Sequence, residues 1–195
     1  MGIRVLEDSQ IQISPFSSTS TYKNLKNNST IAINFVDDIY LYALAALKEK
    51  ESSIELTEFP PEYYDFKYLD THAMDVPYIK KAWGILVCKV SQEFEKTSQN
   101  GFGEVIIPGF KLNTIYQEKF QESFKVFNRA ENLALEAIIL ATRLKVAKKK
   151  NDQQSFNKNY DKISDHIENI RRFGKNEDAI KTIDLITKYV NNLIE

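Results

Sequence analysis

Residues 14–25 have the sequence Ser-Pro-Phe-Ser-Ser-Thr-Ser-Thr-Tyr-Lys-Asn-Leu, and an apolar segment at residues 30–35 follows shortly after. The five consecutive hydroxyl residues at 17–21 offer donors without formal charge, Lys23 adds one cation, and Asn24 can orient a ligand or cap a turn. Hydroxyl and N–H donors that converge at a helix start suit a phosphate group, because the backbone dipole also favours an anion there. Serine and threonine clusters are also common in ordinary loops, so both interpretations stay open at this point.

The segments on either side of this loop have the patterns of strands. Residues 3–5 and 10–13 are predicted strands joined by a turn at residues 7–9, because apolar and polar residues alternate in the second of them. Residues 22–26 predict a short helical turn. The near-continuous apolar segment at 30–35 predicts a strand that is buried on both faces.

The next part of the chain is a helix followed by an irregular aromatic region. Asp37 or Asp38 is predicted to cap a helix that continues to about Lys48. Residues 63–68 are rich in aromatic side chains but have no clean period, and residues 76–78 begin another short segment. No regular element is therefore assigned to this aromatic region.

A long hairpin is predicted after the aromatic region. Residues 82–92 alternate as a strand, and Asn100-Gly101 is a strong hairpin signal. Residues 103–114 form the predicted return strand, which Pro108-Gly109 is expected to interrupt. The first part of the chain is thus an antiparallel unit with one or two helices, consistent with a small barrel.

The last third of the chain has the apolar periodicity of helices. Asn128 is predicted to cap a helix that ends near residue 150, with Glu131 completing a variant of the capping box. A second helix carries apolar residues at alternating spacings of three and four and ends at Gly174, and a third begins at Asn176. The sequence therefore predicts an α+β protein, with a strand-rich domain at residues 1–126 and a helical subdomain at residues 127–195.

Composition and charge exclude several classes of partner. The net charge of -1 provides no overall field for nucleic acid or an anionic membrane. The longest apolar run, residues 133–144, contains Glu136 and Arg143 and is too short and too charged to span a bilayer. Cys88 is the only cysteine, which excludes a disulfide within the chain and favours a reducing, cytoplasmic location.

Few side chains point to catalysis or metal binding. His72 lies among carboxylates in a loop, but a metal site needs three or four convergent ligands, so we interpret it as a solvated histidine. His166 is expected at a helix surface, and Cys88 is expected to be a buried, inert thiol. The sequence has no phosphate-binding glycine loop, dinucleotide fingerprint or nucleophile elbow. We therefore predict no metal site and assign no catalytic residue.

The charged residues of the first predicted C-terminal helix fall into two groups. The basic residues at 145 and 148–150 are expected to complement the helix dipole at its C-terminus rather than to bind nucleic acid. Glu136 and Arg143 are seven residues apart on one helix face, inside an apolar run. We favour pairing or an interface over simple solvation for these two charges, and leave their role, with that of Arg129, unassigned.

Two stretches together resemble a known family. Residues 15–38, with Thr-x-x-Asn-Leu at 21–25, resemble the flavin-contacting region of FMN-binding split-barrel proteins. Residues 127–144, with Phe-Asn-Arg-Ala at their start and Ala-Thr-Arg-Leu at their end, resemble the helical extension of one uncharacterised, flavin-reductase-like branch. The helical motif is the more specific of the two, and the resemblance covers most of the chain.

The resemblance implies a split antiparallel β-barrel of the FMN-binding type with a C-terminal helical subdomain. It also implies a homodimer with FMN bound at the dimer interface, where hydroxyl and amide side chains hold the phosphate and ribityl groups, an aromatic ring lines the flavin pocket and an arginine reaches the flavin. By position, the implied cofactor-binding residues are Arg4, Phe16, Thr19, Ser20, Thr21 and Asn24.

The implied function is FMN binding, with a flavin-dependent oxidoreductase activity on an unspecified substrate and a nicotinamide cofactor as a further partner. The alternatives are a non-catalytic flavin-binding module and a cofactor-free dimeric interaction protein. Family members usually carry an additional strand that ends in Ala-Pro-Met-Gly, and Met1 coincides with that methionine. From this coincidence we expect the chain to lack one barrel strand, to have an exposed sheet edge and to bind flavin more weakly.

Overall fold

The computed structural model describes residues 3–6, 10–47, 58–100, 103–123, 128–173 and 176–194. Several sequence predictions fall outside these residues: the turn at 7–9, the helix end near Lys48, the hairpin tip at Gly101, the helix end at Gly174, and the positions of Gly2 and Phe127. Across the described part of the chain, every helix is too short or too polar to cross a membrane.

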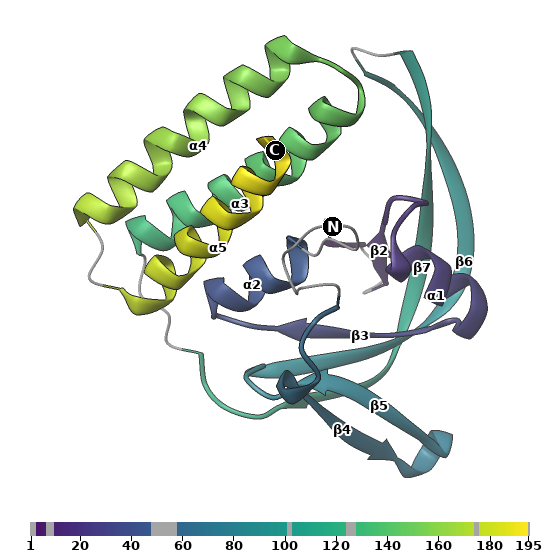
Figure 1. Ribbon diagram of the computed structural model, residues 1–195. Coiled ribbons are helices and arrows are strands. Elements are labelled where there is room, and N and C mark those ends of the chain that lie inside the picture. The colour runs from purple at the N-terminus through teal and green to yellow at the C-terminus, as the bar shows by residue number, and fades with distance from the viewer. Residues whose placement is uncertain are drawn as a thin grey trace. The chain divides into compact units, whose positions relative to one another are not determined.

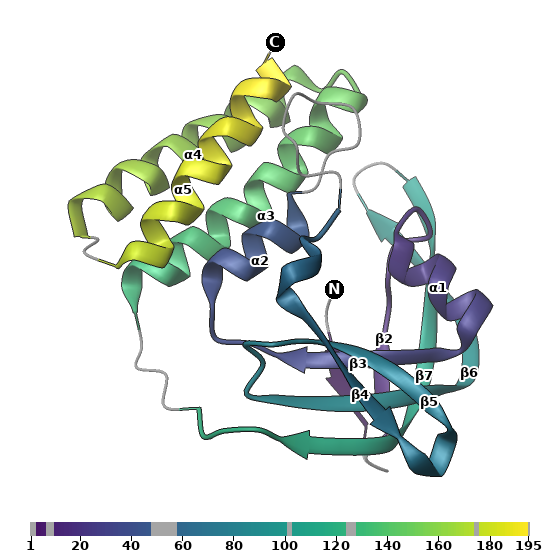
Figure 2. The ribbon, with the colours of Figure 1, turned by 60° about the horizontal axis from the view of Figure 1, so that its bottom comes forward.

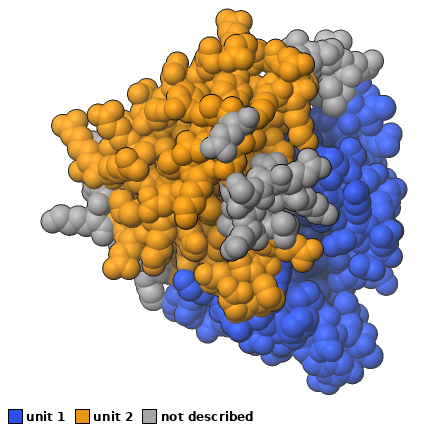
Figure 3. All heavy atoms as spheres, in the orientation of Figure 1, with its two compact units in different colours: residues 1–35, 64–122 blue, residues 36–63, 123–195 orange. Residues whose placement is uncertain are grey.

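The chain divides into two compact units, which are coloured separately in Figure 3. The first combines residues 1–35 with 64–122, and the second combines residues 36–63 with 123–195. The first unit contains the strands in antiparallel sheets and the second is helical, which confirms the predicted α+β class. The division is discontinuous because helix α2 (Ile39–Ala46) packs against the C-terminal helices.

The first unit is built on a five-stranded antiparallel sheet with the order β1-β2-β7-β6-β3 (Figures 1 and 2). A short helix, α1, precedes β3, and the hairpin of β4 and β5 forms a separate two-stranded sheet. The bounds are β1 Ile3–Val5, β2 Ile11–Ile13, α1 Ser20–Asn28, β3 Thr30–Phe35, β4 Tyr64–Leu69, β5 Met74–Ile79, β6 Gly84–Asn100 and β7 Gly103–Lys119, with a 3-10 turn at Asp70–His72. A further 3-10 turn, at Pro61–Tyr63, belongs to the second unit.

The long ribbon of β6 and β7 continues through the point where an interruption was predicted. Each strand has 17 residues, and Pro108 and Gly109 pair with Glu95 and Phe94 in unbroken register. The ring of Phe94 lies over Gly109 so closely that a Cβ there would sit 2.2 Å from its Cζ. The predicted break was therefore wrong, because the neighbouring ring covers the glycine and replaces the packing that a side chain would supply.

The core of the first unit lies between α1 and the sheet. Leu25 is 1% exposed and packs against Ile13, Ile33, Cys88 and other apolar residues of the sheet. Burial of a leucine of this kind stabilises a fold by about 1.5–3 kcal/mol, so Leu25 fixes α1 on the sheet. Cys88 is buried as predicted, and this burial raises the pKa of its thiol.

Strand β3 has the predicted bounds but not the predicted burial. Ile33 is buried, whereas its neighbours along the strand are only partly buried. The expectation that both faces are buried was wrong, because the residues at 30, 32 and 34 line a cavity. The apolar residues of β3 thus contribute both to the core and to the wall of the cavity.

The second unit consists of α2 and three longer helices, α3 (Arg129–Lys149), α4 (Gln153–Phe173) and α5 (Glu177–Ile194), which lie side by side in Figures 1 and 2. Asp38 caps α2, and its carboxylate accepts hydrogen bonds from the N–H groups of Tyr40 and Leu41. Asn128 caps α3 and Asn176 accepts from the N–H of Ala179 at the start of α5, as the sequence predicted.

The charged residues of α3 lie mostly at its surface. Glu136 and Arg143 are both exposed, so simple solvation and an interface with another molecule both stay open for these two charges. Lys148 and Lys149 occupy the last turn, where cations complement the helix dipole.

Candidate functional site

A cavity of about 650 Å³ opens in the first unit between α1, β3 and the β4–β5 hairpin. The cavity falls within the size range of small-molecule sites. The lining residues are Thr21, Asn24, Leu25, Asn28, Thr30, Ile31, Ala32, Asn34, Tyr64, Met74, Asp75, Val76, Pro77 and Ile79.

Helix α1 presents one polar stripe to this cavity. Thr21, Asn24 and Asn28 follow one another at spacings of three and four, so they share a helix face. The adjacent face is anchored by Leu25 and by Tyr22, whose ring centroid lies 5.8 Å from that of Phe110. The packing of the apolar face therefore directs the hydroxyl and amide groups into the cavity.

The opposite wall of the cavity is mostly apolar. The β5 residues Val76, Pro77 and Ile79 supply aliphatic surface, and Tyr64 at the start of β4 adds an aromatic ring. Asp75 is the one charged residue in the described lining. A site with hydroxyl and amide donors on one side and apolar surface on the other suits an elongated ligand with a polar end and a flat apolar end.

Asn34 connects β3 to the end of β5. Its Oδ1 accepts a hydrogen bond from the backbone N–H of Ile79 at 2.8 Å, and its Nδ2 donates to the carbonyl of Ala32 at 3.2 Å. Because both ends of the side-chain amide have a partner, its orientation is fixed. Asn34 lies in the stretch at residues 15–38 that resembles the flavin-contacting region, but it was not among the cofactor-binding residues that the resemblance implied.

The structure brings together only some of the residues that the family resemblance implied. Thr21 and Asn24 line the cavity, and Ser20 is the exposed first residue of α1. Thr19 is instead the N-cap of α1: its Oγ1 accepts from the N–H of Tyr22 at 3.3 Å and donates to the carbonyl of Phe16 at 2.7 Å. Thr19 therefore shapes the start of the helix.

Two of the implied residues lie outside the cavity lining. Phe16 is 75% exposed in the turn before α1. Arg4 is an exposed residue of β1, where it pairs with Gln12 of β2 at the edge of the sheet. Within this single chain neither residue contributes to the wall of the cavity.

The described histidines and carboxylates form no metal-binding cluster. Among the described residues, no group of three or more histidine, cysteine, aspartate or glutamate side chains could hold a metal ion. His72 Nδ1 lies 2.8 Å from the hydroxyl of its neighbour Thr71. The cavity thus remains the main candidate for small-molecule binding in the described first unit.

Two family models match the chain. One is described as the N-terminal domain of a protein of unknown function (DUF447) and matches residues 1–121, and the second, also described as a protein of unknown function (DUF447), matches residues 128–188. The chain belongs to the DUF447 family, because the first match alone covers more than half of it. The family resemblance predicted from the sequence is confirmed.

The chain is also similar to solved structures. The FMN-bound protein MM1853 of Methanosarcina mazei, a DUF447 protein, has a TM-score of 0.74 at 18% identity, over 96% of this chain and 85% of that chain. This likeness shows that the fold is shared. The NADH:FAD oxidoreductase SgcE6 of Streptomyces globisporus, in complex with NAD and FAD fragments, has a TM-score of 0.42 at 13% identity, over 65% of this chain and 74% of that chain.

Among curated proteins, the uncharacterised protein MJ1453 of Methanocaldococcus jannaschii is 25% identical over 141 residues. The alignment covers 71% of this chain and 62% of that protein, so the chain spans less than two thirds of the length of this relative.

Proposed function

We propose that the protein binds FMN non-covalently in the cavity between α1, β3 and the β4–β5 hairpin. The observation that carries the proposal is the lining itself, because one cavity of about 650 Å³ combines the polar stripe of α1 with the apolar surface of β5. FMN has a phosphate and a ribityl chain at one end and a flat ring system at the other, so the two walls match its two ends. The likeness to the FMN-bound protein MM1853 supports the same assignment.

The phosphate would lie at the start of α1. Thr21 offers a hydroxyl and Asn24 an amide from the helix face that lines the cavity. The Oγ1 of Thr19 accepts a hydrogen bond from the N–H of Tyr22, and its carbonyl accepts one from the N–H of Lys23. The N–H groups of Ser20 and Thr21 take no part in this capping. Ser20 and Thr21 would therefore give backbone as well as side-chain donors to the phosphate, while Thr19 fixes the helix start that presents them.

A homodimer is part of the proposal. The exposed ring of Phe16 and the exposed aliphatic side chains of Ile3 and Val5 on β1 are the kind of apolar surface that a second copy would cover. In such a dimer, with the two sheets as the halves of a split barrel, Phe16 would contact the flavin ring and Arg4 would reach its oxygen atoms. The domain division near residue 126 and a cytoplasmic location belong to the same proposal.

The enzymatic part of the proposal is a flavin-dependent oxidoreductase that uses a nicotinamide cofactor. When bound, FMN would supply the electron-transfer chemistry, while the chain binds it, orients it and excludes water from the apolar side of the cavity. A non-catalytic flavin-binding module is the second candidate function, favoured by the lining itself, in which Asp75 is the one side chain of the described residues that carries a charge.

Titration of the purified full chain with FMN, followed by quenching of flavin fluorescence, tests the binding proposal. We expect saturable binding, with affinity reduced about tenfold by Thr21→Ala and by Asn24→Ala, as for loss of one hydrogen bond to a charged group. Thr97→Ala, at an exposed position of β6, is the matched control and should bind like the wild type. A wild-type chain that does not bind FMN would overturn the proposal and leave the cofactor-free interaction protein.

The proposed dimer and the proposed enzymatic activity are tested by separate measurements. Light scattering on a sizing column should give twice the mass of 22.6 kDa, and a monomer that binds FMN would overturn the dimer. Oxidation of NADH or NADPH by the FMN-loaded protein in the presence of added flavin or quinone acceptors is expected. Tight FMN binding without such turnover would favour the non-catalytic module.

A further inference from the structure

We infer that Asn34 is a positioning residue that holds the β4–β5 hairpin as a fixed wall of the cavity and thereby sets the surroundings of the flavin ring. The inference rests on the proposed binding of FMN, and it gives Asn34 a role that the family resemblance did not assign to it. It follows from how the hairpin is attached to the rest of the first unit.

The hairpin is joined to the larger sheet by side chains. In the described part of the chain, β4 and β5 pair with each other and not with the five-stranded sheet. On the cavity side, the hairpin is attached by Asn34, near the end of β3. Its Oδ1 accepts a hydrogen bond from the N–H of Ile79, the last residue of β5. The carbonyl of Ile79 in turn accepts from the N–H of Ala82 at 2.8 Å, so both backbone groups of Ile79 are held.

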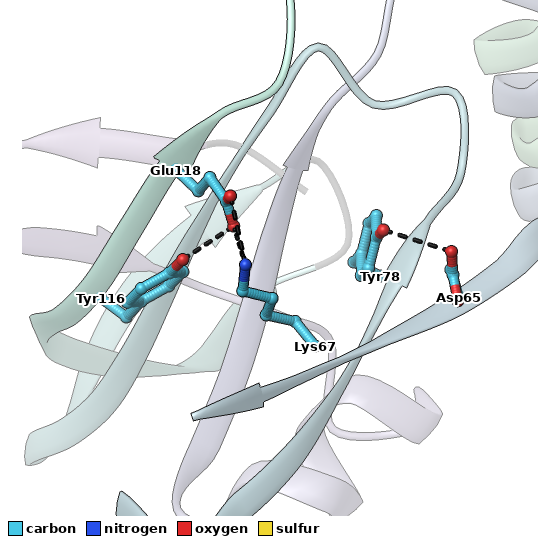
Figure 4. Close-up of polar contacts among 5 residues, drawn as sticks. All are labelled: Asp65, Lys67, Tyr78, Tyr116 and Glu118. Atoms are coloured by element: carbon cyan, nitrogen blue, oxygen red, sulfur yellow. Dashed lines mark hydrogen bonds and ion pairs between the residues drawn. The ribbon is translucent and has the colours of Figure 1, made fainter. Parts of the chain in front are cut away.

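A second attachment holds the other strand of the hairpin, as Figure 4 shows. Lys67 of β4 lies with its Nζ 3.1 Å from Glu118 Oε2 of β7, and the hydroxyl of Tyr116 donates to the same oxygen at 2.7 Å. The hydrogen bond from Tyr116, together with Lys67, lowers the pKa of Glu118, and the hydrogen bond to Glu118 raises the pKa of Lys67. This pair therefore stays charged around neutral pH. Lys67, Tyr116 and Glu118 all lie outside the cavity lining.

The two attachments differ in what they can affect. Asn34 and Ile79 both line the cavity, so loss of their hydrogen bond moves the wall itself. Loss of the Lys67–Glu118 pair loosens the hairpin through two side chains that do not line the cavity and are partly exposed to solvent. A variant at each attachment thus separates an effect on the flavin surroundings from a general loosening of the hairpin.

The experiment compares Asn34→Ala, Asn34→Asp and Lys67→Met in the full chain. Hydrogen–deuterium exchange without FMN is measured first. We expect Asn34→Ala to speed exchange in the peptide that covers residues 74–79 by about tenfold, whereas Asn34→Asp, which retains an acceptor for the Ile79 N–H, keeps most of the protection. Exchange in β6 and β7 should not change with Asn34→Ala, which shows that the variant is folded.

Binding and spectroscopy of FMN then test the effect on the ring. We expect Asn34→Ala to weaken FMN binding about tenfold and to change the visible circular dichroism of the flavin at saturation. Lys67→Met should weaken binding less than threefold and leave that spectrum unchanged. Asn113→Ala is the matched control, because Asn113 bonds to the side chain of Gln10 at 2.9 Å on the exposed surface of β7.

The outcomes separate this inference from the proposed function. Wild-type protein that binds no FMN overturns the proposed function, while the exchange result still decides whether Asn34 holds the hairpin. If the wild type binds FMN and Asn34→Ala leaves both the exchange of residues 74–79 and the flavin spectrum unchanged, the inference is wrong. Equal spectral changes in Asn34→Ala and Lys67→Met would show general loosening and would also overturn it.

Discussion

The side-chain amide of Asn176 donates a hydrogen bond from Nδ2 to Glu131 Oε1 at 2.9 Å, which links the start of α5 to the first turn of α3. The same Glu131 oxygen accepts from Asn128 Nδ2 at 3.3 Å, and Asn128 is the N-cap of α3. The predicted capping box therefore exists in a modified form, because Glu131 contacts the side chain of its capping residue. One carboxylate joins the beginnings of two helices of the second unit.

Asn176→Ala should lower the free energy of unfolding by about 1–2 kcal/mol, because it removes both this link and the hydrogen bond from Ala179 N–H to Asn176 Oδ1. Urea unfolding followed by far-ultraviolet circular dichroism measures the loss. Asn191→Ala, at an exposed position in α5, is the matched control and should be neutral or slightly stabilising, because alanine is the better helix former. Equal effects of the two variants would contradict the linking role.

The helices and most strands were predictable because their signals are local. Capping residues such as Asn128 precede apolar stripes, and β3 has the bounds that its apolar run indicated. The β4–β5 hairpin was missed because its aromatic residues are on the exposed side: Phe66 is 64% exposed and Tyr68 is 55% exposed. Strand prediction from alternation assumes that apolar residues face inward, and here that assumption does not hold.

The candidate site was predictable only at α1. Thr21 and Asn24 belong to a hydroxyl-rich stretch that the sequence places at a helix start, and both lie in α1. Asn34 and Ile79 are 45 residues apart, and nothing in either local pattern says that they meet. Contacts of this kind depend on how a hairpin folds back over a sheet, which sequence periodicity does not encode.

Thr19 and Thr21 should have separable roles. Thr19→Ala is expected to lower the free energy of unfolding by about 1 kcal/mol in the absence of FMN, because the N-cap hydrogen bond to the N–H of Tyr22 is lost. Thr21→Ala should leave stability within about 0.5 kcal/mol of the wild type and affect FMN binding. Urea unfolding of both variants without flavin makes the comparison. A Thr19 variant as stable as the wild type would show that its cap does not hold α1.

The first unit should become less stable in acid, because the Lys67–Glu118 pair loses the charge on Glu118 there. The pKa of Glu118 is lowered in the folded state by the hydrogen bond from Tyr116 and by Lys67, so its contribution is present above the unfolded value of about 4.3 and is lost as the pH falls through the folded pKa. The contribution of Lys67 has the opposite dependence on pH. Because its pKa is raised in the folded state, the contribution is present below the unfolded value of about 10.4 and is lost as the pH rises through the folded pKa.

Glu118→Gln should therefore be less stable than the wild type at pH 7, by less than about 1 kcal/mol because the pair is partly exposed. The difference should shrink as the pH falls below the unfolded value and vanish once the wild-type carboxylate is protonated in the folded state as well. Urea midpoints at pH 7, 5 and 3 measure this convergence. Glu136→Gln, at an exposed carboxylate of α3, is the control and should track the wild type at each pH. A constant difference between wild type and Glu118→Gln at all three values would show that charge is not responsible.

Gly109 and Phe94 should be energetically coupled across the β6–β7 ribbon. A Cβ at Gly109 would lie 2.2–2.8 Å from three atoms at the far end of the Phe94 ring, so Gly109→Ala forces the ring to swing away. We expect a loss of about 1 kcal/mol in the free energy of unfolding, at the low end for overpacking because the ring is on a partly exposed ribbon. In the Phe94→Ala background the same substitution meets no ring and should cost nothing or stabilise the strand. A double-mutant cycle measured by urea unfolding should give a coupling of about 1 kcal/mol, and additive effects would mean that the ring does not rest on the glycine in solution.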